Sequence, residues 1–484
     1  MNTGFASPVG GAMAPSGGLG ALAASRLVFA LSGLAVNLAM ARWLPVESFG
    51  VYRWLMSLCA LASFGTTLGL APWLTKQIVA EPDRARAWTS GVLRVVAALA
   101  TVTTLGIVGW VAVADGRPMV LAAAVAAALG LALGAAASVV EAALHGLHRT
   151  QAEVWPTLLG RGALVVVNLG LLVAGFGVSE VMAGRALTGA FTFVLLWLAL
   201  SREAPRVDVA APGWRAIAWE GRALGATVMF GAVYAQVDVV LLEALAGPEA
   251  VARYAAPATV LLQLALLATV VTRASFPKVA AAADAPTAAA EVRRAAEVLW
   301  AFGIAIAAGG SAVSGALVPW LFGPAYADAA PVFAVLAFAM PLRFLHGHFG
   351  LSLTARDRSG VRARIDGAAA AFNVVVNLLV LARGGAMAAA FTTVATDALL
   401  VLGTGRALSA NLGAVVEPGR MVRWALAAAA MAGAVSAAAA WPVWARVALG
   451  AAIYPALALA FGVLDASSLR GLRPRVGHSD SSRA

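Results

Sequence analysis

Charged residues are scarce in this sequence: they make up 12% of 484 residues, whereas 61% are apolar. Soluble domains carry about 25% charged residues, so the chain has about half of the charge that a water-facing surface of its size needs. This shortage excludes a soluble multi-domain enzyme and indicates that most of the surface faces lipid.

Cysteine and catalytic sequence motifs are almost absent as well. The single cysteine, Cys59, excludes an internal disulfide and a cysteine-based zinc site. The sequence contains no Walker A phosphate-binding loop, no GxSxG pattern and no HExxH pattern. We therefore expect no enzymatic activity, no metal ion and no cofactor, and we do not expect ATP to drive the protein directly.

Long apolar runs predict the fold class, an all-α integral membrane protein with about 14 transmembrane helices. A helix needs about 20 apolar residues to cross a hydrocarbon core of about 30 Å. The expected spans are residues 19–41, 50–70, 89–113, 119–144, 153–174, 178–200, 223–246, 251–275, 296–321, 328–352, 365–382, 385–405, 422–440 and 445–464.

The net charge of +11 does not indicate nucleic acid, because the basic residues stand singly between apolar runs and form no arm or stripe. Their distribution follows membrane topology instead. Connections after even-numbered spans, with the C-terminal tail, hold 23 Lys or Arg residues, and those after odd-numbered spans hold six. Since cytoplasmic loops are enriched in Lys and Arg, both termini are predicted to be cytoplasmic.

Short repeats divide the spans into two lobes. Glu47 precedes Tyr52 by five positions after the first span, and Glu249 precedes Tyr254 by five positions after the seventh. The string VVVNL also occurs in the fifth span and again in the eleventh. Both recurrences lie six spans apart, which predicts two six-helix lobes in parallel pseudo-repeat with a substrate path between them.

The longest polar connections complete the predicted organisation. The Gly/Pro/Ser-rich start is expected to be disordered, and the connection after the sixth span is the natural boundary between lobes. The expected parts are a disordered segment 1–18, an N-lobe 19–200, a cytoplasmic connection 201–222, a C-lobe 223–406, helices 13 and 14 within 407–465, and a cytoplasmic tail 466–484.

Charged side chains inside the spans are the candidate functional residues, because burying a charge in a membrane is costly and such groups usually face a cavity or a partner. Basic ones outnumber acidic ones in the first lobe, which favours an anionic head group, and a guanidinium group suits phosphate because it donates two hydrogen bonds at once. The candidates for a cationic cavity are Arg26, Arg161, Arg185 and Arg343.

Acidic residues and one histidine are candidates for coupling to an ion. Asp238 lies in a polar run of the seventh span and is the best proton or cation site of the second lobe; the other candidates are Asp397, Glu141 and His346. Glu141 lies near the cytoplasmic surface, where pairing with a basic side chain is the alternative. His346 and His348 are two positions apart, so on a helix they face different ways and cannot bind one metal ion together.

Four segments resemble the polysaccharide repeat-unit flippases. Residues 41–54 (ARWLPVESFGVYRW) resemble that family's loop after its first helix, usually AR-x-L-G-P-x-x-F/Y-G-x-Y, although Leu-Pro-Val replaces Leu-Gly-Pro here. Residues 234–264 with 276–280 resemble the seventh and eighth helices, and residues 321–347 and 372–397 are similar to helices nine to twelve. The similarity is spread over most of the chain.

This resemblance implies a fold of the multidrug/oligosaccharidyl-lipid/polysaccharide exporter superfamily. It also implies transfer of an undecaprenyl-diphosphate-linked oligosaccharide from the cytoplasmic to the periplasmic leaflet of a bacterial inner membrane. The product would serve a surface glycan such as O-antigen, capsule or exopolysaccharide. The implied partners are the lipid-linked oligosaccharide and membrane lipids, with the polysaccharide polymerase and the chain-length regulator as further candidates.

Three alternatives remain open at this stage. A lipid II flippase for peptidoglycan shares the fold and differs in being essential. A cation-coupled multidrug exporter of the same superfamily would have an acid-rich first lobe, which this chain lacks. A membrane-embedded glycan polymerase or ligase would carry a long periplasmic loop, whereas every expected periplasmic connection here is short.

Overall fold

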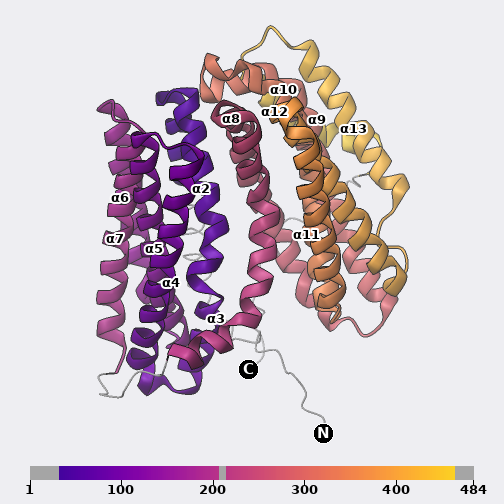
Figure 1. Cartoon of the computed structure of the whole chain (residues 1–484). Coiled ribbons are helices and arrows are strands. Elements are labelled where there is room, and N and C mark those ends of the chain that lie inside the picture. The colour runs from indigo at the N-terminus through magenta and orange to yellow at the C-terminus, as the bar shows by residue number, and fades with distance from the viewer. Residues whose placement is uncertain (1–31, 206–213, 464–484) are drawn as a thin grey trace, which may run out of the picture. The chain divides into compact units, whose positions relative to one another are not determined.

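The described part of the protein is helical and suited to a membrane. The computed structural model describes residues 32–205 and 214–463, and its elements within those ranges are α-helices and short 3-10 helices (Figure 1). Ten helical stretches of these residues are long and apolar enough to cross a membrane. The predicted all-α membrane fold is therefore confirmed, and the count of 14 spans stays a prediction.

The helices follow the predicted apolar runs closely. Residues 32–43 are helical, and the later elements are α2 (Val46–Thr67), α3 (Leu70–Ala80), α4 (Ala85–Ala114), α5 (Pro118–Gly146), α6 (Val154–Val173), α7 (Val178–Glu203), α8 (Trp214–Ala281), α9 (Ala285–Phe322), α10 (Ala330–Ala337), α11 (Ala339–Ala355), α12 (Ser359–Leu412), α13 (Pro418–Ala437) and α14 (Val443–Ala460). The 3-10 helices are η1 (Pro82–Arg84), η2 (Thr150–Glu153) and η3 (Pro324–Ala329).

Two long helices each contain a sharp break at a glycine. α8 is interrupted at Gly247 and α12 at Gly385, with φ angles of 80° and 50°. Glycine adopts positive φ without steric cost, so it can reverse the backbone where other residues would be strained. Gly247 falls between two predicted spans and Gly385 is the first residue of another, so α8 and α12 each contain two of the expected helices.

Helices extend beyond two of the predicted ends. The second expected span continues through α3 to Ala80, after a break at Leu68 and Gly69, which have φ angles of 43° and 71°. The expected polar connection 276–295 is largely helical, because α8 runs to Ala281 and α9 begins at Ala285. Asp284 caps α9 by accepting a hydrogen bond from the Thr287 N–H at 2.8 Å, and this bond lowers the pKa of Asp284. Polarity alone therefore overestimated the length of these connections.

The chain forms two compact units. The described part of unit 1 comprises residues 32–39, 65–109, 121–205 and 214–224, and that of unit 2 comprises residues 40–64, 110–120 and 225–463. Unit 1 has an apolar core built from α3, α4, α5 and α7, with Leu74, Val92 and Val140 fully buried. Unit 2 has a core between α9, α11 and α12, with Val292, Leu353 and Leu408 fully buried.

Within unit 2, the start of α2 packs against the break in α8. A Cβ atom built on Gly50 would lie 1.8 Å from the Pro248 carbonyl oxygen, so only glycine fits there. The Phe49 ring meets Tyr326 edge to face, with centroids 6.1 Å apart. The two copies of the repeated sequence motif therefore lie against each other in this unit.

The last two helices are fixed to α9 by polar contacts. Glu297 accepts hydrogen bonds from Arg420 Nε at 2.7 Å and from the Trp424 indole at 3.0 Å. Arg446 is buried at the start of α14 and donates to the carbonyl oxygens of Ala312 and Val435 at 2.8 and 3.2 Å. These contacts position α13 and α14 on the outer side of the α9 core.

Candidate functional site

Unit 2 contains a polar cavity of about 270 Å³ bounded by α2, α8, α10, α11 and α12. Its wall is mixed, with apolar residues such as Leu261 and Met340 between charged and hydroxyl groups. The polar lining residues are Arg53, Gln236, Asp238, Tyr254, Arg343, His346, Asn373 and Thr393. Three sequence-predicted residues, Asp238, Arg343 and His346, therefore come together here.

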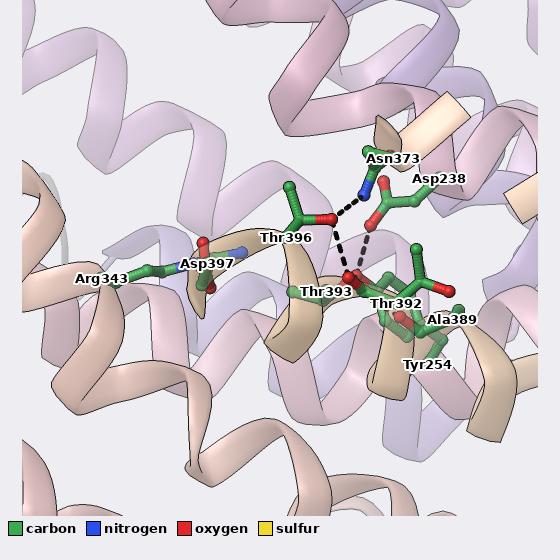
Figure 2. A network of polar contacts seen from close by, with 9 residues as sticks. All are labelled: Asp238, Tyr254, Arg343, Asn373, Ala389, Thr392, Thr393, Thr396 and Asp397. Atoms are coloured by element: carbon green, nitrogen blue, oxygen red, sulfur yellow. Dashed lines mark hydrogen bonds and ion pairs between the residues drawn. The ribbon is translucent and has the colours of Figure 1, made fainter. Parts of the chain in front are cut away.

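Asp238 is the buried carboxylate of this cavity. The Tyr254 hydroxyl donates a hydrogen bond to Asp238 Oδ2, and the Val239 N–H donates to Oδ1 at 2.8 Å (Figure 2). Tyr254 in turn lies 2.9 Å from the Thr393 hydroxyl. Within the described residues Asp238 makes no ion pair, so hydrogen-bond donors hold the group.

Asparagine and threonine side chains extend this network across the break in α12. Asn373 donates to the Thr396 hydroxyl at 3.1 Å (Figure 2). Asn377 in turn donates to Asn373 at 3.0 Å. Thr396 and Thr393 also donate to backbone carbonyl oxygens one turn earlier. The hydrogen bond between Asn373 and Thr396 thus joins the two halves of α12 through buried polar side chains.

Arg343 and Asp397 form an ion pair with a nitrogen–oxygen distance of 3.0 Å. The Asp397 side chain is fully buried, while Arg343 is 28% exposed where it faces the cavity. Asp397, a predicted ion-coupling residue, is therefore the counter-charge of Arg343. Removing one member of such a buried pair costs about 3–5 kcal/mol because the other charge stays buried.

The two histidines of α11 face different ways, as their spacing predicts. His346 lines the cavity, whereas His348 is buried with its Nε2 atom 3.0 Å from the Val292 carbonyl oxygen of α9. His348 therefore has a structural partner in the helix behind it, and His346 is the one beside the cavity.

Unit 1 contains a second polar cavity, of about 350 Å³, between α5, α6 and α7. Glu141, Arg161 and Arg185 line it together, so three further predicted residues meet in one place. Apart from Leu164, the other described lining residues are small or hydroxylated: Gly130, Gly134, Ala137, Ser138, Thr157, Gly160, Thr188, Gly189 and Thr192. Two guanidinium groups against one carboxylate give this cavity a cationic character, which suits phosphate oxygens.

Close packing of glycine shapes the unit 1 cavity. A Cβ atom on Gly160 would lie 2.0 Å from the Thr192 hydroxyl oxygen, whereas one on Gly134 would meet nothing within 4 Å. Small residues allow helices to approach closely inside a membrane, where no hydrophobic driving force acts between them. α6 and α7 therefore touch at Gly160 and leave room beside Arg161 and Arg185.

A third polar cluster lies at the loop between α4 and α5. Arg117 pairs with Asp115 at 2.7 Å and also with Glu47 at the start of α2. The hydrogen bond from the guanidinium holds the pKa of Asp115 below its usual range, and the two carboxylates raise the pKa of Arg117. This cluster ties the loop to α2 within unit 2.

The remaining predictions fall as follows. Arg26 lies outside the described residues. Asn168, a buried polar residue of α6, donates to the Leu164 carbonyl oxygen of its own helix at 2.8 Å. Sequence reasoning missed Arg53 and Thr393, and it used Tyr254 only as a repeat marker. Arg53 directly follows Tyr52 in the α2 copy of the repeated motif, and Tyr254 is the matching tyrosine of the second copy. The repeat is therefore the sequence signal that could have identified Arg53 and Tyr254 as site residues.

Comparisons with solved structures show the fold. The chain is similar to a lipid II flippase, MurJ, in an inward closed conformation, with a TM-score of 0.71 and 11% identity over 91% of this chain and 98% of that chain. It is also similar to a MATE-family multidrug resistance transporter of the MOP superfamily in an inward-facing conformation, with a TM-score of 0.60 and 16% identity over 78% of this chain and 94% of that chain.

A third similar structure is a MOP superfamily transporter from Pyrococcus furiosus described as having a binding pocket of reverse polarity, with a TM-score of 0.53 and 15% identity over 80% of this chain and 93% of that chain. No curated protein sequence matches the chain. A family model described as a polysaccharide biosynthesis protein matches residues 39–331, which is more than half of the sequence. The chain therefore belongs to this family of polysaccharide biosynthesis proteins.

Proposed function

We propose that the chain is a flippase that moves an undecaprenyl-diphosphate-linked oligosaccharide across the bacterial inner membrane for surface polysaccharide biosynthesis. The observation that carries the proposal is the pair of arginines, Arg161 and Arg185, in one intramembrane cavity of a protein from this family. The shared fold of the lipid II flippase and the MATE transporter supports a carrier mechanism.

The diphosphate group is the part of the cargo that the cavities are equipped to hold. Each guanidinium group can donate two parallel hydrogen bonds to phosphate oxygens, and these bonds strengthen where water is excluded. Arg161 and Arg185 supply them in unit 1, and Arg53 and Arg343 supply them in unit 2. Arg26 is a further candidate, while the hydrocarbon tail would stay in the bilayer.

After the cargo is released, an ion gradient must favour the return of the carrier to its inward-facing state. The buried carboxylates are suited to bind the coupling ion. Asp238 is the first candidate because it is held by neutral donors, so it can bind a proton or a small cation without breaking an ion pair. Asp397 and Glu141 are further candidates. In this mechanism the two six-helix lobes would rock against each other, with both termini in the cytoplasm.

The matching experiment replaces the arginines in a strain whose surface glycan depends on this protein. We expect Arg161→Ala and Arg185→Ala to reduce glycan export about tenfold each, since a hydrogen bond to a charged group is worth about 1.5–3 kcal/mol. Lipid-linked saccharide should accumulate in the cytoplasmic leaflet. Arg94→Ala is the matched control, because Arg94 is exposed on α4 and donates to its own helix. Normal export by the Arg161/Arg185 double variant would refute the proposal.

The fold likeness to a lipid II flippase keeps peptidoglycan precursor transport as the second candidate. Both cargoes carry a diphosphate, so the cavities do not separate them. Essentiality does: loss of a surface-glycan flippase is tolerated, whereas loss of the sole lipid II flippase is lethal. Complementation of a depleted lipid II flippase by this protein would favour the second candidate.

A further inference from the structure

His346, on α11, lies between two ion pairs of unit 2. On one side is the pair of Arg343 and Asp397 at 3.0 Å. On the other side is the pair of Arg362 and Asp366, with a nitrogen–oxygen distance of 3.4 Å. The Nε2 atom of His346 is 4.0 Å from Asp366 Oδ1. The imidazole therefore connects the cavity of unit 2 to a carboxylate on the first turns of α12.

Arg362 is held against α11 in a way that orients Asp366. A Cβ atom on Gly350 would lie 3.0 Å from Arg362 Nε, so the glycine leaves the space that the guanidinium group occupies. Arg362 also donates to the Thr354 hydroxyl at 3.3 Å. The guanidinium group engages Asp366 Oδ2, which leaves Oδ1 on the side of His346.

Two polar atoms of this arrangement are buried without a hydrogen-bond partner among the described residues: His346 Nδ1 and Asp366 Oδ1. The His346 side chain is only 15% exposed. Buried polar atoms are normally paired, and an orphaned one calls for an explanation such as a group that gains or loses a proton. Both orphans belong to the same pair.

The charges around His346 are balanced when the imidazole is neutral. Arg343 on its own helix is matched by Asp397, and Arg362 is matched by Asp366. Across the cavity stand Arg53 of α2 and Asp238 of α8 with its partner Tyr254. The nearby charges of α9 pair elsewhere: Arg293 with Glu417, and Glu297 with Arg420. A proton on His346 therefore adds one positive charge to the cavity wall.

We propose that His346 and Asp366 form a proton-exchange pair whose proton is linked to the anionic head group in the unit 2 cavity. The diphosphate supplies the negative charge that an imidazolium group needs, so binding of the anion draws one proton onto the ring. On release, the N–H proton passes to a carboxylate oxygen of Asp366 and from there to water, so the neutral ring and the ionised Asp366 are both restored and no other bond changes. The proposal rests on the proposed function and assigns it a proton as the coupling ion.

The test is proton uptake by the purified full-length protein when inorganic pyrophosphate is added in weakly buffered solution near pH 6.5. We expect wild-type protein to take up as much as one proton per bound pyrophosphate beyond the amount that His346→Asn takes up. Any change in the protonation of pyrophosphate itself is the same for both proteins. The difference in proton uptake between them therefore reports the protonation of the His346 imidazole. Asp366→Asn should lose at least half of this difference, while His348→Asn, the matched control on α11, should keep it.

Equal uptake by wild-type protein and His346→Asn would overturn the proposal, and so would the absence of pyrophosphate binding. If His346→Asn does not fold, Asp366→Asn carries the same test, and full uptake by that variant overturns the pair. Glycan export measured in parallel separates the two claims. Export that needs Arg161 and Arg185 without any linked proton refutes only the pair, whereas a linked proton without export refutes only the flippase.

Discussion

The two polar cavities of this protein are built from different chemistry. The unit 1 cavity places Arg161 and Arg185 beside Glu141 among glycines and threonines, so its described lining carries two guanidinium groups and one carboxylate. The unit 2 cavity pairs Arg343 with Asp397 and holds Asp238 with neutral donors. An excess of one sign suits the capture of an oppositely charged group, whereas balanced charges suit small changes in protonation. We therefore propose that unit 1 contributes most of the affinity for the head group and that unit 2, which also contacts the head group, provides the coupling.

The largest effect is expected from a substitution that removes one charge of the buried ion pair in unit 2. Asp397→Leu leaves Arg343 without its buried partner, so we expect a loss of about 3–5 kcal/mol in the free energy of unfolding. The double variant Arg343→Met/Asp397→Leu should recover most of that loss, because no unpaired charge remains. Thermal unfolding of the detergent-purified variants measures both. A double variant as unstable as the single one would show that the ion pair is not what stabilises this cavity.

The next effect tests the shape of the unit 1 cavity. Gly160→Ala forces a Cβ atom against Thr192, so the helices α6 and α7 must separate, and we expect a loss of about 1–3 kcal/mol with reduced export. Gly134→Ala lines the same cavity with open space around it and should change stability by less than about 0.5 kcal/mol. The same unfolding assay compares them. Similar losses for both variants would mean that glycine serves helix packing generally and not this contact.

Much of the fold was predictable because its signals are local. Apolar runs located the helices, and the breaks at Gly247 and Gly385 fell between expected spans or at the start of one. The pairing of Arg343 with Asp397 was not predictable, since 54 positions separate the two residues and only the packing of α11 on α12 brings them together. Spacing did predict that His346 and His348 face different surroundings.

A third prediction separates coupling from binding. Asp238→Asn keeps the shape of the unit 2 cavity but removes the carboxylate, so export should lose most of its dependence on added cation, whereas the proton uptake linked to His346 should remain. Pyrophosphate affinity should change by less than about threefold, because the arginines remain. Tyr254→Phe removes only one donor to Asp238 and should cost about 1 kcal/mol of stability. Unchanged ion dependence in Asp238→Asn would assign coupling to another residue.

The smallest effect concerns the exposed cluster outside the cavities. The pKa of Asp115 is lowered in the folded state, so its contribution to stability is present above its unfolded value of about 4 and is lost as pH falls through the folded value. Arg117 is 44% exposed and solvent screens the pair, so we expect only about 0.5 kcal/mol. Asp115→Asn should lower the unfolding temperature slightly at pH 7, and this difference should shrink as pH falls below about 4. A decrease that stays the same as pH falls would exclude the ion pair as its cause.

The claim that unit 1 binds the head group and unit 2 provides the coupling is tested most directly by the binding of undecaprenyl diphosphate to purified protein in nanodiscs. We predict that Arg161→Ala/Arg185→Ala weakens binding at least tenfold, since each lost hydrogen bond to phosphate is worth about 1.5–3 kcal/mol. Asp238→Asn should change the same dissociation constant by less than about threefold. Equal affinities for the wild-type protein and the arginine double variant would contradict the account.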